Sequence, residues 1–267
     1  MASTELRPAQ VETLAQPVTA AKGRRPLKII VTRPEPDASA FAKLAREAGF
    51  EPILSPAMTV AFSSAPPQLE GVGALAFTSA NGVRAFAAAG GPSMLPVFAV
   101  GGITAAEAGR LGFPNATSAV GDVASLAKVV SAAFAEGRFT GTVLHIGGTD
   151  RAGDLVGALA ARGMTADLAV LYEAVPAASL SKEAAATLAA APPAVSIALF
   201  SPRSARIFAD LVVASGLEPA CAKIEAYCIS AATAAALGPL IFARVAVAGE
   251  PNQAAMLDLI PTAGPTP

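Results

Sequence analysis

Short polar clusters, each directly after an apolar run, hold most of the residues in this sequence that could bind a ligand. The eight clusters are Thr32-Arg33, Thr78-Ser79-Ala80-Asn81, Gly101-Gly102-Ile103-Thr104, Gly121-Asp122, the stretch from Gly147 to Arg151, Ser201-Pro202-Arg203-Ser204, the stretch from Ser230 to Thr233, and the stretch from Gly249 to Asn252. A hydroxyl side chain in such a place often does no more than cap the next helix. The start of a helix also presents free backbone N–H groups and partial positive charge, which suit a carboxylate or a phosphate. Together with the arginines in three of them, the eight clusters favour binding of an anionic ligand.

Conventional catalytic motifs are absent from the sequence. His145 is the only histidine, and its place inside the apolar run Val143–Ile146 is typical of a hydrogen-bonded core residue. Because no second histidine is present, neither Ser79 nor Ser201 has a convincing catalytic triad. A phosphate-binding P-loop and an HExxH zinc motif are missing, and Gly147-Gly148 does not begin a stretch with dinucleotide-binding spacing.

The two cysteines, Cys221 and Cys228, are too few for a disulfide framework and lie far from any second Cys/His pair that could complete a zinc site. We therefore expect them to be structural, and we expect the protein to use neither a metal nor a cofactor.

Composition excludes several classes of protein. The chain of 267 residues is 53% hydrophobic and 15% charged, which excludes intrinsic disorder for its body. A formal net charge of -1 gives no electrostatic reason to expect binding to nucleic acid or to an anionic membrane. No stretch approaches the roughly 18 uncharged apolar residues of a membrane-spanning helix. We expect a reduced, cytoplasmic protein with one large domain or, preferably, two small ones.

The clusters must be positioned by the elements between them, and those elements alternate between strand and helix. Strands are predicted at Leu27–Thr32, Glu51–Leu54, Ala74–Phe77, Val97–Val100, Val143–Ile146, Leu168–Tyr172, Ser196–Phe200, Ile224–Ile229 and Arg244–Ala248. A helix from Asp37 to Ala48 is expected to have Asp37 as its N-cap and Gly49 just beyond its end. The alternation predicts an α/β fold with mainly parallel sheets covered by helices, in which the carboxyl ends of the strands line the ligand site. Residues 1–26 are expected to form a disordered tail, and the chain is expected to fray from Ile260.

An internal repeat indicates two similar halves. The segment from Ile30-Val31 through Gly49 matches the segment from Leu144-His145 through Gly163, at an offset of 114 residues. The residues Ser79, Arg84 and Phe86 match Ser201, Arg206 and Phe208, at an offset of 122. At offsets of about 129, Thr104-Ala105-Ala106 matches Thr233-Ala234-Ala235, and Val120-Gly121-Asp122 matches Ala248-Gly249-Glu250. Four matches in one order favour a duplicated chain. The sequence thus predicts two α/β lobes with a cleft between them for the anionic ligand.

At these residues the chain resembles the uroporphyrinogen-III synthase family. The matching pieces are Val31-Thr32-Arg33-Pro34, Phe77-Thr78-Ser79, Val100 through Ala105, Gly121-Asp122 through Leu126, the turn and helix from Gly147 to Gly163, Val170-Leu171-Tyr172, and Leu199-Phe200-Ser201-Pro202. The resemblance runs from about Leu27 to Ile260. Two turns depart from the family pattern: Ser230-Ala231-Ala232-Thr233 stands where the family usually has Gly-Pro-Thr-Thr, and Glu250-Pro251-Asn252-Gln253 lacks the usual Ser/Thr before proline.

The resemblance implies that the two lobes exchange their first repeat units. One lobe would comprise 27–57 with 177–262 and the other 61–168, with linker strands at 57–60 and 169–176. Pro56 and Pro176 fit strands that leave one sheet for a two-stranded bridge. Such a bridge implies hinge motion between the lobes.

The resemblance further implies the cyclisation of a linear tetrapyrrole, hydroxymethylbilane, to uroporphyrinogen III, with loss of water and inversion of the last pyrrole. Tyr172 would be the acid that protonates the departing hydroxyl, although it could instead only pack the linker. The substrate-binding residues would be Arg33, Ser79, Asn81, Gly101, Gly102, Thr104, Arg151, Ser201, Arg203 and Thr233. The expected state is a monomer, with transient handover of substrate from the preceding enzyme.

Three alternatives remain open at this stage. A family member with altered second-lobe turns could regulate or bind a ligand without catalysis. A two-lobed receptor could bind an anion without chemistry, although the sequence shows no secretory signal. A flavodoxin-like enzyme would need a phosphate loop that the sequence lacks.

Overall fold

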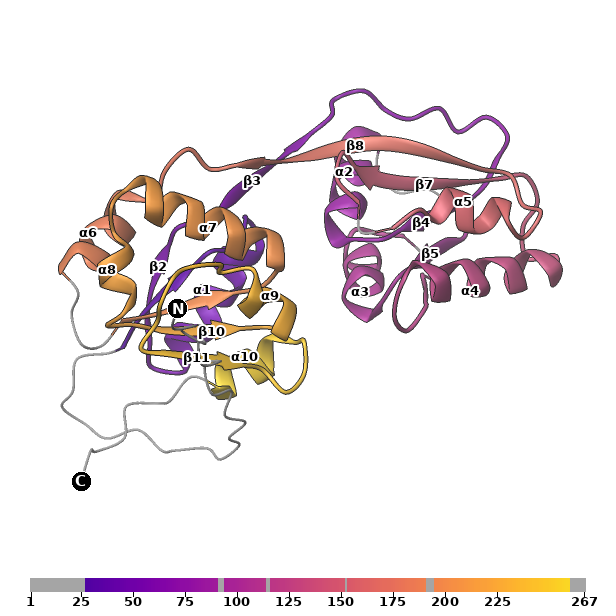
Figure 1. Ribbon diagram of the computed structural model, residues 1–267. Coiled ribbons are helices and arrows are strands. Elements are labelled where there is room, and N and C mark those ends of the chain that lie inside the picture. Colours follow the sequence, from indigo (N-terminus) through magenta and orange to yellow (C-terminus); the bar gives the residue numbers. More distant parts are fainter. Residues whose placement is uncertain (1–26, 91–93, 114–115, 152, 191–194, 260–267) are drawn as a thin grey trace, which may run out of the picture. The chain divides into compact units, whose positions relative to one another are not determined.

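The computed structural model describes residues 27–90, 94–113, 116–151, 153–190 and 195–259 (Figure 1). The expected tail at 1–26 and the expected fraying from Ile260 lie outside these residues. The chain forms two compact units: one contains the described residues up to Thr59 and from Pro176 onward, which we call unit 1, and the other is Val60–Val175, which we call unit 2. The chain passes between them within strand β3 (Met58–Phe62) and at the end of strand β8 (Ala166–Pro176).

Unit 2 is built on a six-stranded sheet in the order β3-β8-β7-β4-β5-β6. Its other strands are β4 (Val72–Phe77), β5 (Val97–Ala99), β6 (Thr117–Ser118) and β7 (Thr142–Gly148), and the pairs from β8 through β6 are parallel. Its helices are α2 (Ala80–Gly90), α3 (Gly102–Arg110), α4 (Val123–Ala135) and α5 (Leu155–Ala160).

Helices cover both faces of the unit 2 sheet because successive strand side chains point to opposite sides. Leu75 and Phe77 of β4 pack with Phe86 of α2 on one face. On the other face, Ala74 and Ala76 pack in a layer with residues of α4 and α5. Each face of the sheet therefore has its own apolar layer, and the polar clusters are left at the strand ends.

Unit 1 contains a five-stranded parallel sheet in the order β11-β10-β9-β1-β2. The strands are β1 (Lys28–Val31), β2 (Glu51–Leu54), β9 (Val195–Leu199), β10 (Glu225–Cys228) and β11 (Arg244–Val247). The helices are α1 (Asp37–Glu47), α6 (Lys182–Ala190), α7 (Pro202–Ala214), α8 (Glu218–Cys221), α9 (Ala231–Ala235) and α10 (Gln253–Leu259). Ile30 and Phe208 lie in one apolar layer, and Ile29, Phe41 and Met256 in the other. The mixed α/β architecture with mainly parallel sheets agrees with the prediction.

Equivalent residues of the two sheets pair in the same register. Ile30 of β1 pairs with Ile197 of β9. The residue 114 positions after Ile30 is Leu144, the residue 122 positions before Ile197 is Leu75, and these two pair with each other in unit 2. The first repeat unit of each half therefore pairs with the second unit of the other half, because β1 lies beside β9 and β7 lies beside β4.

Two local predictions at helix α1 have opposite outcomes. Gly49 lies just beyond the C-cap Ala48 with φ of 89°, as expected for a left-handed position that glycine favours. The prediction that Asp37 is the N-cap is wrong, because the cap is Pro36 and Asp37 lies in the first turn. The Asp37 carboxylate instead forms an ion pair with Arg33, and the Glu35 carboxylate accepts hydrogen bonds from the backbone N–H and the hydroxyl of Ser39.

Among the helices of the described residues, none is both long and apolar enough to span a membrane.

Candidate functional site

The carboxyl edge of the unit 2 sheet brings together hydroxyl groups from two strands that are not adjacent. Ser79 follows β4 and Tyr172 lies in β8, with β7 between them. The Ser79 Oγ and the Tyr172 OH are 2.8 Å apart, at hydrogen-bonding distance. The backbone N–H of Gly82 also donates to Ser79 Oγ, at 3.2 Å, so Ser79 caps the start of α2 as well. The pair has two hydroxyl hydrogens and uses one of them internally, so it keeps one donor for a ligand.

Gly148 provides the space for the Tyr172 ring. It is the last residue of β7 and pairs with Tyr172 of β8. A Cβ at Gly148 would lie 2.6 Å from Cε2 and 2.8 Å from Cζ of Tyr172. The ring therefore occupies the volume that a side chain at this strand position would fill.

His145 is a buried and hydrogen-bonded core residue, as predicted. Its Nε2 lies 3.0 Å from the Thr78 hydroxyl, and only 1% of the residue is exposed. Burial, reinforced by the nearby charge of Arg151, lowers the pKa of His145 to about 4. The imidazole is therefore neutral at physiological pH, where it serves as a partner for Thr78.

Arg151 folds back onto the loop that follows β7. Its Nη1 donates to the carbonyl oxygens of Gly148, at 2.8 Å, and Thr149, at 3.3 Å. The guanidinium thus lies at the carboxyl end of β7, where its charge is available to an anionic ligand.

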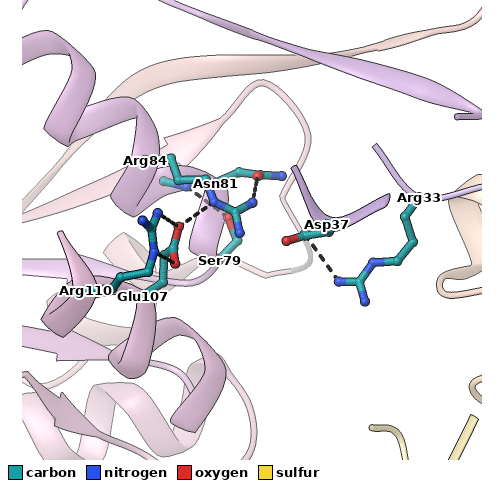
Figure 2. Close-up of polar contacts among 8 residues, drawn as sticks. Arg33, Asp37, Ser79, Asn81, Arg84, Glu107 and Arg110 are labelled. Carbon is teal, nitrogen blue, oxygen red and sulfur yellow. Dashed lines mark hydrogen bonds and ion pairs between the residues drawn. The ribbon is translucent and has the colours of Figure 1, made fainter. Parts of the chain in front are cut away.

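Asn81 belongs to a network that joins helices α2 and α3 (Figure 2). The Asn81 Oδ1 accepts a hydrogen bond from Arg84 Nη1 at 2.9 Å, and Arg84 Nε lies 2.6 Å from the Glu107 carboxylate. Arg110 donates to both oxygens of the same carboxylate. Hydrogen bonding from Arg110, together with the hydrogen bond from Arg84, lowers the pKa of Glu107 to about 2. With its oxygen held by Arg84, the Asn81 amide keeps its N–H groups as donors.

Helix α3 begins at two glycines and differs from most helices of the described residues in having no side-chain cap. Its N-cap is Gly101, in extended conformation, and Gly102 is the first helical residue. Gly102 and Ile103 are exposed, whereas Thr104 is only 6% exposed. Backbone N–H groups, rather than the hydroxyl of Thr104, are therefore what this turn offers to an anion.

In unit 1, two contacts hold the side chain of Arg33, which follows β1 (Figure 2). Arg33 Nη2 lies 3.2 Å from Asp37 Oδ2, and its guanidinium lies 4.7 Å from the centre of the Phe200 ring. Thr32 is fully buried, and its hydroxyl donates to the Ala198 carbonyl oxygen. Stacking and ion pairing hold the Arg33 guanidinium at the carboxyl edge of the unit 1 sheet.

The two serine turns of unit 1 cap helices in the same way. Ser201 Oγ accepts from the N–H of Ser204, at the start of the helix that carries Arg203. Ser230 Oγ accepts from the N–H of Thr233, and the two hydroxyl oxygens are 2.9 Å apart. Thr233 is fully buried. Its hydroxyl therefore belongs to the cap of α9.

The predicted site residues thus form two groups, which we describe separately. The first group lies in the unit 2 sheet or directly after one of its strands, and it contains Tyr172, Ser79, Asn81, Arg151 and the turn of Gly101, Gly102 and Thr104. The second group follows strands of the unit 1 sheet, and it contains Arg33, Ser201, Arg203 and Thr233. Sequence reasoning missed the part played by Gly148 and the Arg84–Glu107 ion pair.

Neither omission had a clear sequence signal. Arg84 and Glu107 are 23 residues apart on different helices, and the repeat places Ala236 at the position of Glu107. The role of Gly148 depends on a pairing between strands, which short sequence patterns do not reveal.

Within the described residues, no group of three His, Cys, Asp or Glu side chains could hold a metal ion. The two cysteines are free and buried, and burial raises the pKa of Cys221 to about 11 and that of Cys228 to about 12. Both thiols are protonated at physiological pH and act as small apolar side chains.

Fold and site together define a duplicated α/β protein in which the sheet edges carry helix starts, arginines and the half-buried Ser79–Tyr172 hydroxyl pair. Comparison with known proteins identifies the family. The protein-family model for uroporphyrinogen-III synthase HemD matches residues 39–258. The chain belongs to the uroporphyrinogen-III synthase family, whose enzymes are lyases of tetrapyrrole synthesis.

Solved structures of the same family are similar to this chain. Uroporphyrinogen-III synthetase from Helicobacter pylori is 16% identical, with 87% of this chain and 97% of that chain covered and a TM-score of 0.57. A mutant uroporphyrinogen III synthase from Thermus thermophilus is 18% identical, with 86% and 96% covered and a TM-score of 0.48. Comparison with curated protein sequences gives no significant match.

Proposed function

We propose that this chain closes hydroxymethylbilane to uroporphyrinogen III, with Tyr172 as the proton donor. The observation that carries the proposal is the Ser79–Tyr172 hydroxyl pair at the carboxyl edge of unit 2. In the described part of the chain, the Tyr172 hydroxyl has Ser79 as its hydrogen-bond partner, so the pair retains a hydrogen for the substrate. His145 is buried and neutral, which removes the imidazole from this role.

The chemistry asks little of the protein beyond this donor. Proton transfer from Tyr172 lets the terminal hydroxyl leave as water, and the electron-rich pyrrole next to it stabilises the carbocation. The substituted α-carbon of the last pyrrole then bonds to that methylene carbon, and the bond between this α-carbon and its original bridging methylene breaks. The freed methylene, again a carbocation stabilised by its own pyrrole, bonds to the other, unsubstituted α-carbon of the last pyrrole. That carbon loses its proton as the ring regains aromaticity, and the proton restores the tyrosine. Closure without inversion competes, so orientation of the last pyrrole decides the product.

The remaining site residues would orient the substrate through its carboxylates. Arg151 and the Asn81 amide offer donors in unit 2, as do the backbone N–H groups at the start of α3. Arg33 and Arg203 offer positive charge in unit 1. Because these groups carry no proton-transfer role, their loss should weaken binding more than turnover.

The experiment is to supply freshly prepared hydroxymethylbilane to the purified chain and to separate the product isomers. Predominant type III product is the expected result, because spontaneous closure gives type I. Only the type I isomer, at the rate seen without protein, would refute the proposal. Tyr172→Phe should lower turnover and leave KM within about twofold, since the ring and its packing are kept.

A ligand-binding family member without catalysis is the second candidate. It is favoured by the Ser230 turn, where the predicted ligand residue Thr233 is fully buried in a helix cap. This candidate predicts saturable binding of the bilane with no type III product, whereas an enzyme converts it. As part of the enzyme proposal, we also expect the chain to be a cytoplasmic monomer that receives its substrate from the preceding enzyme. Light scattering of the purified chain tests whether it is a monomer.

A further inference from the structure

We propose that Gly148 is a positioning residue for the reaction: the missing side chain at this position creates the space that holds the Tyr172 hydroxyl against Ser79. The inference rests on the proposed function, in which the Tyr172 hydroxyl donates the proton. It adds a residue that does not touch the substrate and acts only through the tyrosine.

The backbone does not require glycine at position 148. The φ of Gly148 lies outside the left-handed region, and the residue ends strand β7 where the pairing with β8 shifts in register, from Gly147 with Val170 to Gly148 with Tyr172. What requires glycine is the ring of Tyr172, whose Cε2, Cζ and Cδ2 would lie 2.6, 2.8 and 3.1 Å from a Cβ. Ordinary carbon–carbon contacts are about 3.5–4.0 Å, so an added methyl group would force the ring back by roughly 1 Å.

The Tyr172 ring would yield to an added methyl group by pivoting. The Tyr172 carbonyl oxygen accepts a hydrogen bond from the Thr149 N–H at 3.1 Å, which ties its backbone to the chain beyond Gly148. The ring also packs against the apolar layer that includes Leu171 and Ile146. Since the contact is with the far end of the ring, a pivot displaces the hydroxyl more than any other atom. The 2.8 Å hydrogen bond to Ser79 would then be broken.

A second glycine of the same unit distinguishes this positioning role from general packing. Gly109, on the exposed surface of α3 in the same unit, has open space where a Cβ would lie. Gly109→Ala therefore adds the same methyl group without a clash, and it is the matched control. Only Gly148→Ala should disturb Tyr172.

The spectroscopic test uses the fact that the chain has two tyrosines and no tryptophan. Carbon-13 labelling at the tyrosine Cζ gives two NMR signals, and Tyr172→Phe assigns them. We expect Gly148→Ala to shift the Tyr172 signal and to leave that of the buried Tyr227 in place, while Gly109→Ala shifts neither. An unchanged Tyr172 signal in folded Gly148→Ala would overturn the proposal, whatever reaction the protein performs.

The kinetic test compares Gly148→Ala with Tyr172→Phe. A displacement of roughly 1 Å in a reacting group can lower the rate by about 10²-fold. We expect kcat of Gly148→Ala to fall to the level of Tyr172→Phe, with KM within about twofold of the wild type. Full kcat in Gly148→Ala would also overturn the proposal. Failure of the wild type to form type III product would instead refute the function, and the NMR result would still decide the contact.

A double variant keeps the test decisive if Gly148→Ala does not fold. Tyr172→Ala removes the ring, so adding Gly148→Ala to it should cost no further thermal stability or activity. Folding of the double variant alongside an unfolded single variant would support the contact, because the ring alone would then explain the failure. If the double variant is also unfolded while Tyr172→Ala is folded, glycine is needed for another reason and the proposal is wrong.

Discussion

Replacing Glu107 by glutamine should reduce the stability of the protein by an amount that depends on pH. Glu107 and Arg84 are mostly buried, with side-chain exposures of 11% and 13%, and they join α3 to α2. Hydrogen bonds from Arg110 and Arg84 lower the pKa of Glu107 from 4.5 to about 2. Because each unit of pKa corresponds to about 1.4 kcal/mol, ionised Glu107 stabilises the folded state by about 3 kcal/mol at neutral pH.

The sign of the pH dependence follows from the direction of this change in pKa. A carboxyl with a lowered folded-state pKa contributes its full stabilisation above pH 4.5, and it loses that contribution as the pH falls toward 2. At pH 3 the unfolded chain is mostly protonated at this residue while the folded protein is still largely ionised. Roughly two fifths of the contribution then remains, so about 2 kcal/mol is lost between pH 7 and pH 3.

Urea unfolding of the wild type and of Glu107→Gln at several pH values measures this effect. Other carboxylates titrate equally in both proteins, so the difference between their unfolding free energies isolates Glu107. We expect this difference to shrink by about 2 kcal/mol from pH 7 to pH 3. Glu136→Gln, at an exposed position, makes the same change from carboxylate to amide and is the control. A difference that stays constant with pH would show that Glu107 is not held by the arginines in the folded protein.

Three further predictions concern buried side chains of the site and core. The single His145 should give one imidazole resonance that titrates near pH 4 rather than near 6.5, and acidification through this range should destabilise the protein because the unfolded chain binds the proton first. Thr104→Ala should lower the melting temperature and leave KM within about twofold, since this side chain is buried; a rise in KM at unchanged stability would restore it as a substrate contact. Cys221 and Cys228 should resist a thiol-specific disulfide reagent at pH 8 in the native protein and react on unfolding, and rapid native labelling would contradict their burial.

The sequence predicted strands and helices well where apolar periodicity was strong. It failed where a short strand without apolar residues is defined only by its hydrogen bonds to a neighbouring strand. Strand β2 occupies the predicted Glu51–Leu54. Strand β6 was missed because it has only two residues, Thr117 and Ser118, neither of which is apolar. The repeat contained the missing information, because the positions 129 residues later are Ala246 and Val247 of strand β11.

Prediction of the site had a similar limit. Sequence position was enough to place Ser79 and Tyr172 after or within strands, and so at a sheet edge. It could not show that Thr104 is buried while Gly102 is exposed, because helical phase within one turn depends on packing against neighbouring elements. Nor could it show that Asp37 pairs with Arg33 instead of capping α1.

The repeat shows why the proposed proton donor, Tyr172, has no counterpart in unit 1. Both units place a serine after the equivalent strand, Ser79 after β4 and Ser201 after β9. The residue 114 positions before Tyr172 is Met58, which has no hydroxyl, and Ser201 hydrogen-bonds to Ser204 of its own helix. The pairing register of β1 with β9 matches that of β7 with β4, but the pairing of β1 with β2 ends at Leu54 and Met58 lies in β3 of the six-stranded sheet. Both the strand path and the side chain therefore differ at this position. Under the proposed function, a tyrosine and a facing glycine that occur in only one copy are what give this duplicated scaffold its acid.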